Sequence, residues 1–121
     1  MSKFISLIFI LFSFFMNAQQ IYEGQGYQSD IDEYWKIELE INSSGEYIIS
    51  YPTIPCKGKW IKVYENGNKL YFKEKIFEGK DLCNDNGIIL LKKENAETYL
   101  FYCFLSQDGT EPYAHGKLYK K

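Results

Sequence analysis

Glu74 is the residue of this sequence with the clearest capacity for chemistry. It lies in an alternating segment and shares its parity with Leu70, Phe72 and Ile76, so all four side chains are expected on the inner face of a strand. A carboxylate in an apolar interior is unfavourable unless it is paired or hydrogen-bonded. The pattern therefore predicts an interior acid with a specific role.

Two roles fit such an acid. In the functional interpretation, Glu74 is a ligand anchor or an acid with a perturbed pKa inside a cavity. In the structural interpretation, it is held by backbone amides near Cys56, or by Lys57 or Lys59. The structural role is the more common one for a buried carboxylate, and the sequence leaves both open.

Cys103 and His115 form the second candidate pair, and His115 is the only histidine. A turn of three or five residues centred on Gly109 would place them opposite each other, and a thiolate beside an imidazole is a nucleophile. A turn of two or four residues would put them on opposite faces of the sheet. Because the sequence shows neither a third catalytic member nor an oxyanion hole, we expect a surface histidine and a small buried cysteine.

Other polar groups give weaker signals. Glu38 and Glu40 share the polar face of one strand, so a solvated exterior is a better interpretation than a glycosidase pair. The oxygen-rich segment 81–86 lacks the spacing of a calcium loop and is expected to be a turn. Three scattered cysteines and one histidine lack zinc spacing. We therefore expect no metal and no cofactor.

Composition limits the partners. The chain has 121 residues, which favours one domain, with 14 basic residues, 16 acidic residues and a formal net charge of −2. All the basic residues are lysines, and the chain is rich in aromatics, with 11 Tyr, 9 Phe and 2 Trp. Lysines near Trp60 and Tyr64 could suggest base stacking, but without arginine and with a negative net charge we expect no nucleic-acid binding.

The first 18 residues are typical of a secretory signal peptide. Lys3 provides a positive start, residues 4–16 carry no charge, and Ala18 ends the run. As a helix, this uncharged run would span about 20 Å, less than the roughly 30 Å of a bilayer core. We expect cleavage after Ala18, a single domain over 19–121, export to the periplasm or the extracellular space, and no stable membrane insertion afterwards. An uncleaved N-terminal anchor is the alternative.

The remaining chain alternates with period two almost throughout, and short turns such as Asn66-Gly67 separate the alternating runs. Eight short strands joined in this way form an antiparallel meander, and closing it removes both edges. We therefore predict an all-β, eight-stranded up-and-down barrel, with a two-sheet sandwich as the alternative. The expected strands are 21–27, 34–41, 46–51, 59–64, 70–77, 88–91, 98–105 and 113–119.

The three cysteines lie after the expected signal peptide, in an oxidising compartment. Cys56 and Cys83 are in segments with the composition of loops, whereas Cys103 is inside a strand. We predict a disulfide between Cys56 and Cys83 and a free Cys103. Alternatively, Cys103 takes one of these partners or pairs between chains.

Three spaced motifs support this architecture. They are Tyr-Pro-x-x-Pro-Cys-x-Gly at 51–58, Phe-x-Glu-x-Ile-x-x-Gly-x-x-x-Cys-x-x-x-Gly at 72–87, and Ala-x-Gly-x-Leu at 114–118. Together they resemble small bacterial lipocalin-like domains, which are barrels of the calycin type. The resemblance implies the barrel fold and the disulfide, and it implies no established ligand or reaction.

The expected function is binding rather than catalysis. In the leading hypothesis, an exported barrel binds a small apolar molecule or a protein partner. Its interior site would contain Glu74, Phe72, Trp35 and Trp60, and Tyr22 and Tyr27 would line the cavity mouth together with Trp35, Trp60 and Phe72. We expect a filled interior with at most a shallow pocket near one end.

The alternative is an enzyme inhibitor or immunity-type protein that acts through the disulfide-held loop 51–58, with Tyr51, Pro52 and Pro55 as contacts. An enzyme using Glu74 or Cys103 is the least favoured class.

Overall fold

The computed structural model describes residues 19–83, 85–105 and 111–121. The expected signal peptide at 1–18 and its cleavage site lie outside the described residues, so both remain predictions. Within these ranges, no helix is long and apolar enough to cross a membrane.

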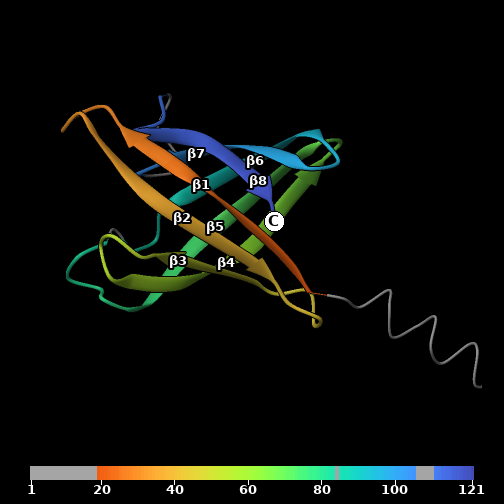
Figure 1. The fold of residues 1–121 in the computed structure, drawn as a ribbon, viewed down its shortest axis with the longest axis horizontal. Coiled ribbons are helices and arrows are strands. Elements are labelled where there is room, and N and C mark those ends of the chain that lie inside the picture. Colours follow the sequence, from red (N-terminus) through yellow and green to blue (C-terminus); the bar gives the residue numbers. More distant parts are fainter. Residues whose placement is uncertain (1–18, 84, 106–110) are drawn as a thin grey trace, which may run out of the picture.

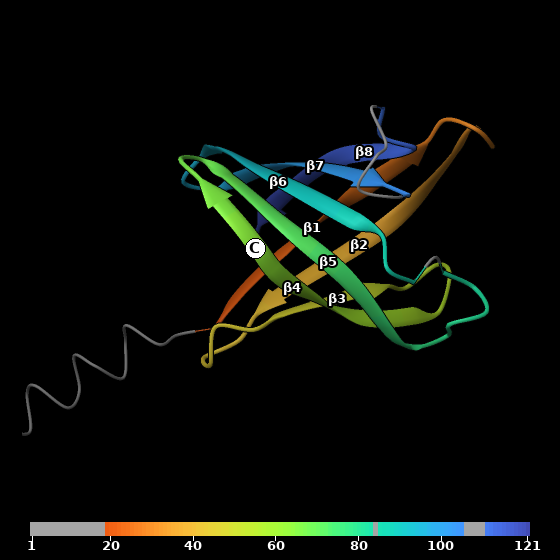
Figure 2. The same ribbon diagram turned by 180° about the vertical axis from the view of Figure 1, so that it is seen from behind.

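The described chain forms eight antiparallel strands in one closed barrel, which confirms the predicted fold class (Figures 1 and 2). Each strand pairs with the next, and β8 pairs with β1 from Tyr22 opposite Lys120 to Gln28 opposite Ala114. The sandwich alternative is wrong, because this pairing leaves no open edge. The strands are β1 Gln20–Gln28, β2 Glu33–Ile41, β3 Tyr47–Tyr51, β4 Cys56–Asn66, β5 Lys69–Glu78, β6 Ile88–Asn95, β7 Thr98–Phe104 and β8 Ala114–Lys120.

Two strands differ appreciably from the predicted boundaries. β4 begins at Cys56 rather than Lys59, because Tyr51 pairs directly with Cys56 across a short turn. β6 continues to Asn95 rather than ending at Leu91. Backbone pairing with β7 extends it through charged, exposed residues, which apolar periodicity does not detect.

Alternation determines which side chains fill the interior. In β2, Trp35, Ile37 and Leu39 are buried, whereas Lys36 and Glu38 between them are exposed. Inward-facing residues of the other strands add to this set and fill the centre of the barrel with apolar side chains.

At the centre of the interior, the rings of Trp60 and Phe101 stack with 5.7 Å between centroids and 10° between planes. Phe72 packs against Trp60 at 5.7 Å. Trp60 is 2% exposed, and Phe72 and Phe101 are fully buried. The middle of the barrel is therefore a packed core.

The seam between β1 and β8 depends on glycine. A Cβ atom built on Gly24 would lie 1.8 Å from the backbone oxygen of Lys117, and one built on Gly116 would lie 1.9 Å from that of Gln25. No side chain fits at such distances, so glycine lets the first and last strands approach closely enough to close the barrel.

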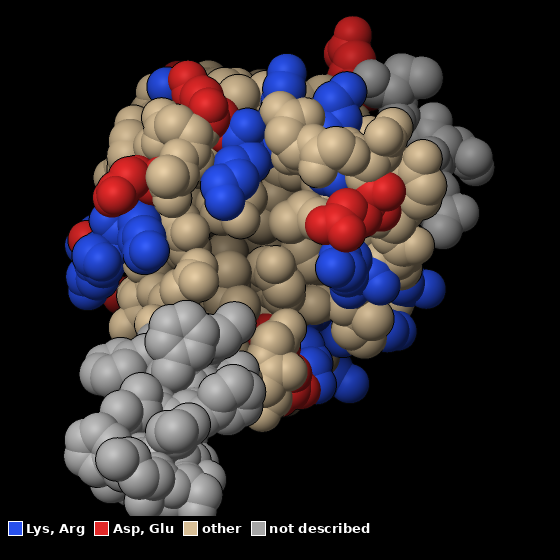
Figure 3. Space-filling model, turned by 90° about the vertical axis from the view of Figure 1, so that its right-hand side faces the viewer, with Lys and Arg blue, Asp and Glu red and all other residues tan. Residues whose placement is uncertain are grey.

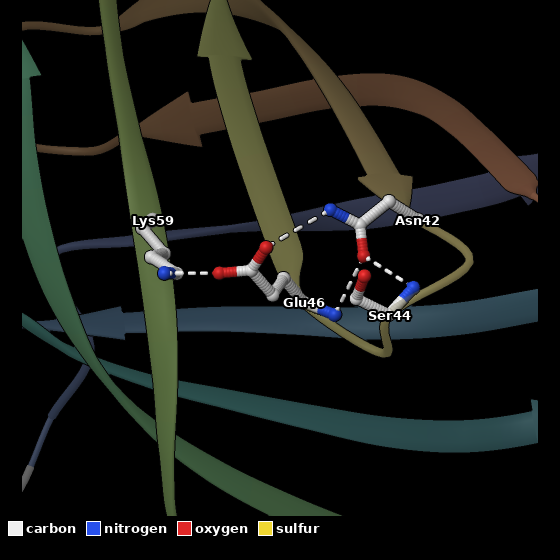
Figure 4. A network of polar contacts seen from close by, with 4 residues as sticks. All are labelled: Asn42, Ser44, Glu46 and Lys59. Atoms are coloured by element: carbon white, nitrogen blue, oxygen red, sulfur yellow. Dashed lines mark hydrogen bonds and ion pairs between the residues drawn. The ribbon is translucent and has the colours of Figure 1, made fainter.

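The turn between β2 and β3 is held by Asn42, as Figure 4 shows. Its side-chain oxygen accepts hydrogen bonds from the backbone amides of Ser44 at 3.0 Å and Glu46 at 2.9 Å. The Glu46 carboxylate accepts a hydrogen bond from the Asn42 side chain and pairs with Lys59 on β4. This network fixes the register of β3 between its neighbours.

The two ends of the barrel differ. Figure 3 shows the end where β1 begins, and there Lys and Asp or Glu side chains surround a surface of uncharged residues. The rings of Tyr22 and Tyr99, from the starts of β1 and β7, pack at 5.2 Å near this end. The opposite end carries the disulfide and the cavity described next.

Candidate functional site

A cavity of about 250 Å³ opens at the barrel end that carries the disulfide. It lies between the β1–β2, β3–β4 and β5–β6 connections and the facing ends of β7 and β8. We call it the end cavity. Its lining residues are Gln28, Asp30, Trp35, Tyr51, Ile54, Glu74, Leu82, Cys83, Leu105 and Tyr113.

Glu74 reaches the end cavity from the interior face of β5 and is 3% exposed, as its strand parity predicted. The Tyr51 hydroxyl and the Trp60 indole Nε1 both donate hydrogen bonds to its Oε2 atom, the latter at 2.8 Å. Trp60 stands directly opposite Glu74 in the β4–β5 register. Two donors from two neighbouring strands thus hold one carboxylate oxygen.

The predicted partners of Glu74 are wrong. Lys57 is exposed, and Lys59 pairs with Glu46. The reason is that alternate residues of a strand face opposite sides of the sheet. Cys56 and Trp60 are buried, so the lysines between them point outward. The structural interpretation named lysines and backbone amides, whereas the hydrogen bonds come from a tyrosine and a tryptophan.

The second oxygen of Glu74, Oε1, accepts no hydrogen bond from the part of the chain that the structure describes. Since Glu74 lines the end cavity, its carboxylate is a candidate acceptor for a ligand there.

Burial raises the pKa of Glu74, while the hydrogen bonds from Tyr51 and Trp60 oppose this and Asp85 adds to it. Burial also raises the pKa of Tyr51 well above its usual value, and the nearby Glu74 carboxylate raises it further. Tyr51 therefore keeps its proton and acts as a donor to Glu74.

We expect Glu74→Gln to gain stability relative to the wild type as the pH rises. An acid with a raised pKa in the folded state binds more protons there than in the unfolded chain. Its contribution to folding stability is therefore greatest below the usual glutamate pKa of about 4.3, and this contribution is lost as the pH rises through the raised pKa. Glutamine keeps an acceptor for Tyr51 and Trp60 without the charge. Thermal unfolding from about pH 4 to about pH 8 should show the melting-temperature difference, variant minus wild type, increasing.

Glu38→Gln is the matched control, because Glu38 is exposed on the outer face of β2. A difference for Glu74→Gln that stays flat or decreases over this pH range would contradict the burial of an ionisable carboxylate.

Cys103 and His115 do not face each other. The β7–β8 register pairs Cys103 with Ala114 and Tyr102 with His115, so the thiol points inward and the imidazole outward. Burial raises the pKa of Cys103 to about 12, and it is therefore a neutral thiol at physiological pH. The expectation of a surface histidine and a small buried cysteine is confirmed.

The predicted disulfide is present between Cys56 and Cys83, with 6.3 Å between their Cα atoms. Cys103 is the free, buried cysteine, so the alternative pairings within the chain are wrong. The bond joins the start of β4 to the β5–β6 connection, at the rim of the end cavity.

The possible protein-contact loop divides into two groups. Pro52 and Pro55 are exposed, as a contact loop requires. Tyr51 is 4% exposed and bonds to Glu74, so its assignment as a surface contact residue is wrong. The reason is again parity, because Tyr51 is an inward-facing residue of β3.

The aromatic residues that were expected around one site lie in different parts of the barrel. Trp35 lines the end cavity, whereas Trp60 and Phe72 belong to the packed core and do not line it. Tyr27 lies on the outer face beside Tyr34, with 4.9 Å between ring centroids. Tyr22 lies near the opposite end, so neither it nor Tyr27 forms the mouth.

Sequence reasoning missed much of the lining. Gln28, Asp30, Leu82, Leu105 and Tyr113 come from strand ends and connections that are far apart in sequence. Strand periodicity carries no signal for such residues. Only barrel closure, which brings the β1–β2 connection beside the start of β8, places them around one cavity.

The other polar groups considered in the sequence, in segment 81–86 and on the strand with Glu38 and Glu40, form a turn and an outer strand face. Asp85 accepts hydrogen bonds from the amides of Ile76 at 2.9 Å and Asn86 at 3.1 Å, and the bond from Ile76 is the main cause of its lowered pKa. Glu38 is exposed and Glu40 is half-buried on the outer face. In the described ranges, no three potential ligands come together as a metal site would require.

Comparisons with known proteins assign no family. No family model matches the chain, and no solved structure matches it. Over 80 residues, 66% of this chain, it is 35% identical to the chaperone protein HtpG of Buchnera aphidicola subsp. Schizaphis graminum. This similarity spans about 11% of the length of that curated relative.

Proposed function

We propose that this chain is an exported, non-catalytic binding protein of lipocalin-like architecture that holds a small molecule in the end cavity. The observation that carries the proposal is Glu74, a carboxylate that is 3% exposed, lines that cavity, and has an Oε1 atom that accepts no hydrogen bond from the residues that the structure describes. A buried acid with one unoccupied acceptor is suited to hold a polar group of a ligand.

The surroundings favour binding over catalysis. Tyr51 and Trp60 hold one Glu74 oxygen from two strands, which fixes the carboxylate in place. The buried thiol of Cys103 is neutral at physiological pH, and His115 is on the outer surface. The residues nearest the carboxylate therefore supply a fixed acceptor without an activated nucleophile.

The size of the end cavity limits the ligand. A volume of about 250 Å³ is below the roughly 300–1,000 Å³ of pockets for drug-sized molecules. The buried core residues of the described chain, Trp60, Phe72 and Phe101 among them, fill the barrel beneath it. A compact molecule that enters from the barrel end fits these dimensions.

Native mass spectrometry of the protein purified from the organism that makes it tests this proposal. We expect the wild type to carry a small bound molecule. Ile54→Trp should lose it, because Ile54 lines the cavity and a larger ring there fills the space. Ile61→Trp, at an exposed position of β4, is the matched control and should keep the molecule.

Wild-type protein without any bound molecule would contradict the proposal. So would a bound molecule that Ile54→Trp retains at the wild-type level, because that molecule would then occupy another place.

A further inference from the structure

The end cavity has charged groups of one sign. Its ionisable lining residues include two carboxylates, Glu74 at the inner end and Asp30 on the β1–β2 connection. None of the described lining residues is a lysine or a histidine. Elsewhere on the barrel, lysines pair with exposed acids, as Lys59 does with Glu46. A ligand in this cavity therefore meets negative charge that no basic side chain of the lining neutralises.

Three aromatic rings accompany these acids. Trp35, Tyr51 and Tyr113 all line the cavity, and the rings of Trp35 and Tyr51 meet edge to face with 5.3 Å between centroids. The faces of such rings attract cations, and tryptophan does so most strongly. The Trp35 indole Nε1 donates to the Gln28 side chain at 3.2 Å, which holds its ring in position.

The rest of the lining is apolar. Ile54, Leu82 and Leu105 form this part, and Leu82 and Leu105 are 58% and 61% exposed. Exposed leucines at a cavity rim lose contact with water when a ligand covers them, which favours a ligand with an apolar portion.

We propose that the end cavity binds a small organic cation, a protonated amine that carries an apolar group, with its ammonium group against the Glu74 carboxylate. This rests on the proposed function, since it names the ligand class of the same site. The ammonium donates to Glu74 Oε1 and contacts the aromatic rings, while the apolar group covers Ile54, Leu82 and Leu105.

Other ligand classes fit less well. An anion would meet Glu74 and Asp30 without a basic side chain among the described lining residues. A neutral alcohol could donate a hydrogen bond to Glu74 but would not compensate the charge of a buried carboxylate. An ammonium cation donates a hydrogen bond and also compensates the carboxylate charge, so it is the ligand class that best complements this cavity.

The titration of Glu74 should make amine binding depend on pH. The groups near Glu74 are Tyr51 of β3, Trp60 of β4, Asp85 of the β5–β6 connection, Cys103 of β7 and Tyr113 beside β8. None of them is a base that could supply the missing positive charge. Because an ammonium requires ionised Glu74, amine binding should become tighter as the pH rises through the pKa of Glu74 and should release protons.

Calorimetric titration with matched probes tests the inference. One series shares a phenylethyl group: 2-phenylethylamine, 2-phenylethanol and 3-phenylpropionate. A second shares a hexyl chain: hexylamine, 1-hexanol and heptanoate. At neutral pH, we expect each amine to bind at least about tenfold more tightly than its alcohol, and each carboxylate to bind most weakly.

Variants test which carboxylate of the cavity pairs with the bound amine. Glu74→Gln should weaken amine binding by at least about tenfold and change alcohol binding much less, because the glutamine NH2 that replaces Oε1 carries no charge and can donate to an alcohol oxygen but not to an ammonium. Asp30→Asn should weaken amine binding less, because Asp30 is exposed. Glu38→Gln, on the outer face, is the control and should leave both unchanged. Circular dichroism verifies that each variant is folded.

The outcomes separate the two claims. If alcohols or carboxylates bind as tightly as amines, and Ile54→Trp abolishes that binding, then the cation inference is wrong and the proposed function stands. Amine binding that Glu74→Gln leaves unchanged also overturns the inference. If no probe of either series binds, the cation inference is overturned, and native mass spectrometry decides the proposed function separately.

Discussion

Gly116→Ala is expected to destabilise the barrel by about 3 kcal/mol. The new Cβ atom would lie 1.9 Å from the backbone oxygen of Gln25, so β1 and β8 would have to move apart. Backbone atoms cannot rotate away as a flexible side chain can. The seam that closes the barrel would therefore weaken along its length, and urea unfolding should show a lower midpoint.

Gly45→Ala is the matched control for this substitution. Gly45 has a φ of +82°, and nothing lies within 4 Å of its added Cβ atom. Its substitution should cost only the strain of a left-handed backbone, about 1–2 kcal/mol. Equal losses for the two variants would mean that the β1–β8 approach is looser than described.

Cys56→Ser is expected to lower the free energy of unfolding by about 3.5 kcal/mol under oxidising conditions. The disulfide joins residues 27 positions apart, so its loss lets the unfolded chain explore many more conformations. A domain of this size buries a modest fraction of its surface, and a loss of this size is a large part of its stability. Chemical denaturation of the oxidised wild type and the variant measures the effect.

Cys103→Ala is the control for the loss of a cysteine. Cys103 is free and buried, so its replacement should cost about 1 kcal/mol, the transfer of a small apolar group. The reverse order of effects would contradict the importance of the Cys56–Cys83 link. Reducing agent should destabilise the wild type and leave Cys56→Ser unchanged.

The inside and outside of the strands could be predicted from the sequence because alternation is a local property. Trp35, Ile37 and Leu39 are buried as expected, and the inward position of Glu74 follows from the same rule. Closure also follows from physical reasoning, since a meander of eight strands that stays open exposes two edges.

Contacts between strands could not be predicted in the same way. Whether Cys103 faces His115 depends on a shift of one residue in the β7–β8 register, and the sequence leaves the turn length open. The partners of Glu74 depend on the register between β4 and β5, which places Trp60 opposite it. Parity alone predicts that the acid is buried, but it does not predict what binds it.

The lining of the end cavity could not be predicted from the sequence either. Its lining combines residues from separate connections, such as Asp30, Leu82 and Tyr113, which carry no common pattern in the sequence. Trp35 was expected there and lines it, whereas Trp60 and Phe72 fill the core instead. Ring size and strand parity predict burial, but the depth of a residue along the barrel depends on the stagger of all eight strands.

Titration of the Glu74 side-chain carboxyl by carbon-detected NMR, assigned by comparison with Glu74→Gln, tests the central claim most directly. We expect its pKa to be above the usual glutamate value, because burial at the inner end of the cavity disfavours the charged form. We also expect 2-phenylethylamine to lower that pKa by pairing with the carboxylate. A carboxyl that titrates at or below the usual glutamate value in the protein without the amine, or whose pKa the amine leaves unchanged, would contradict a buried acceptor facing a binding site.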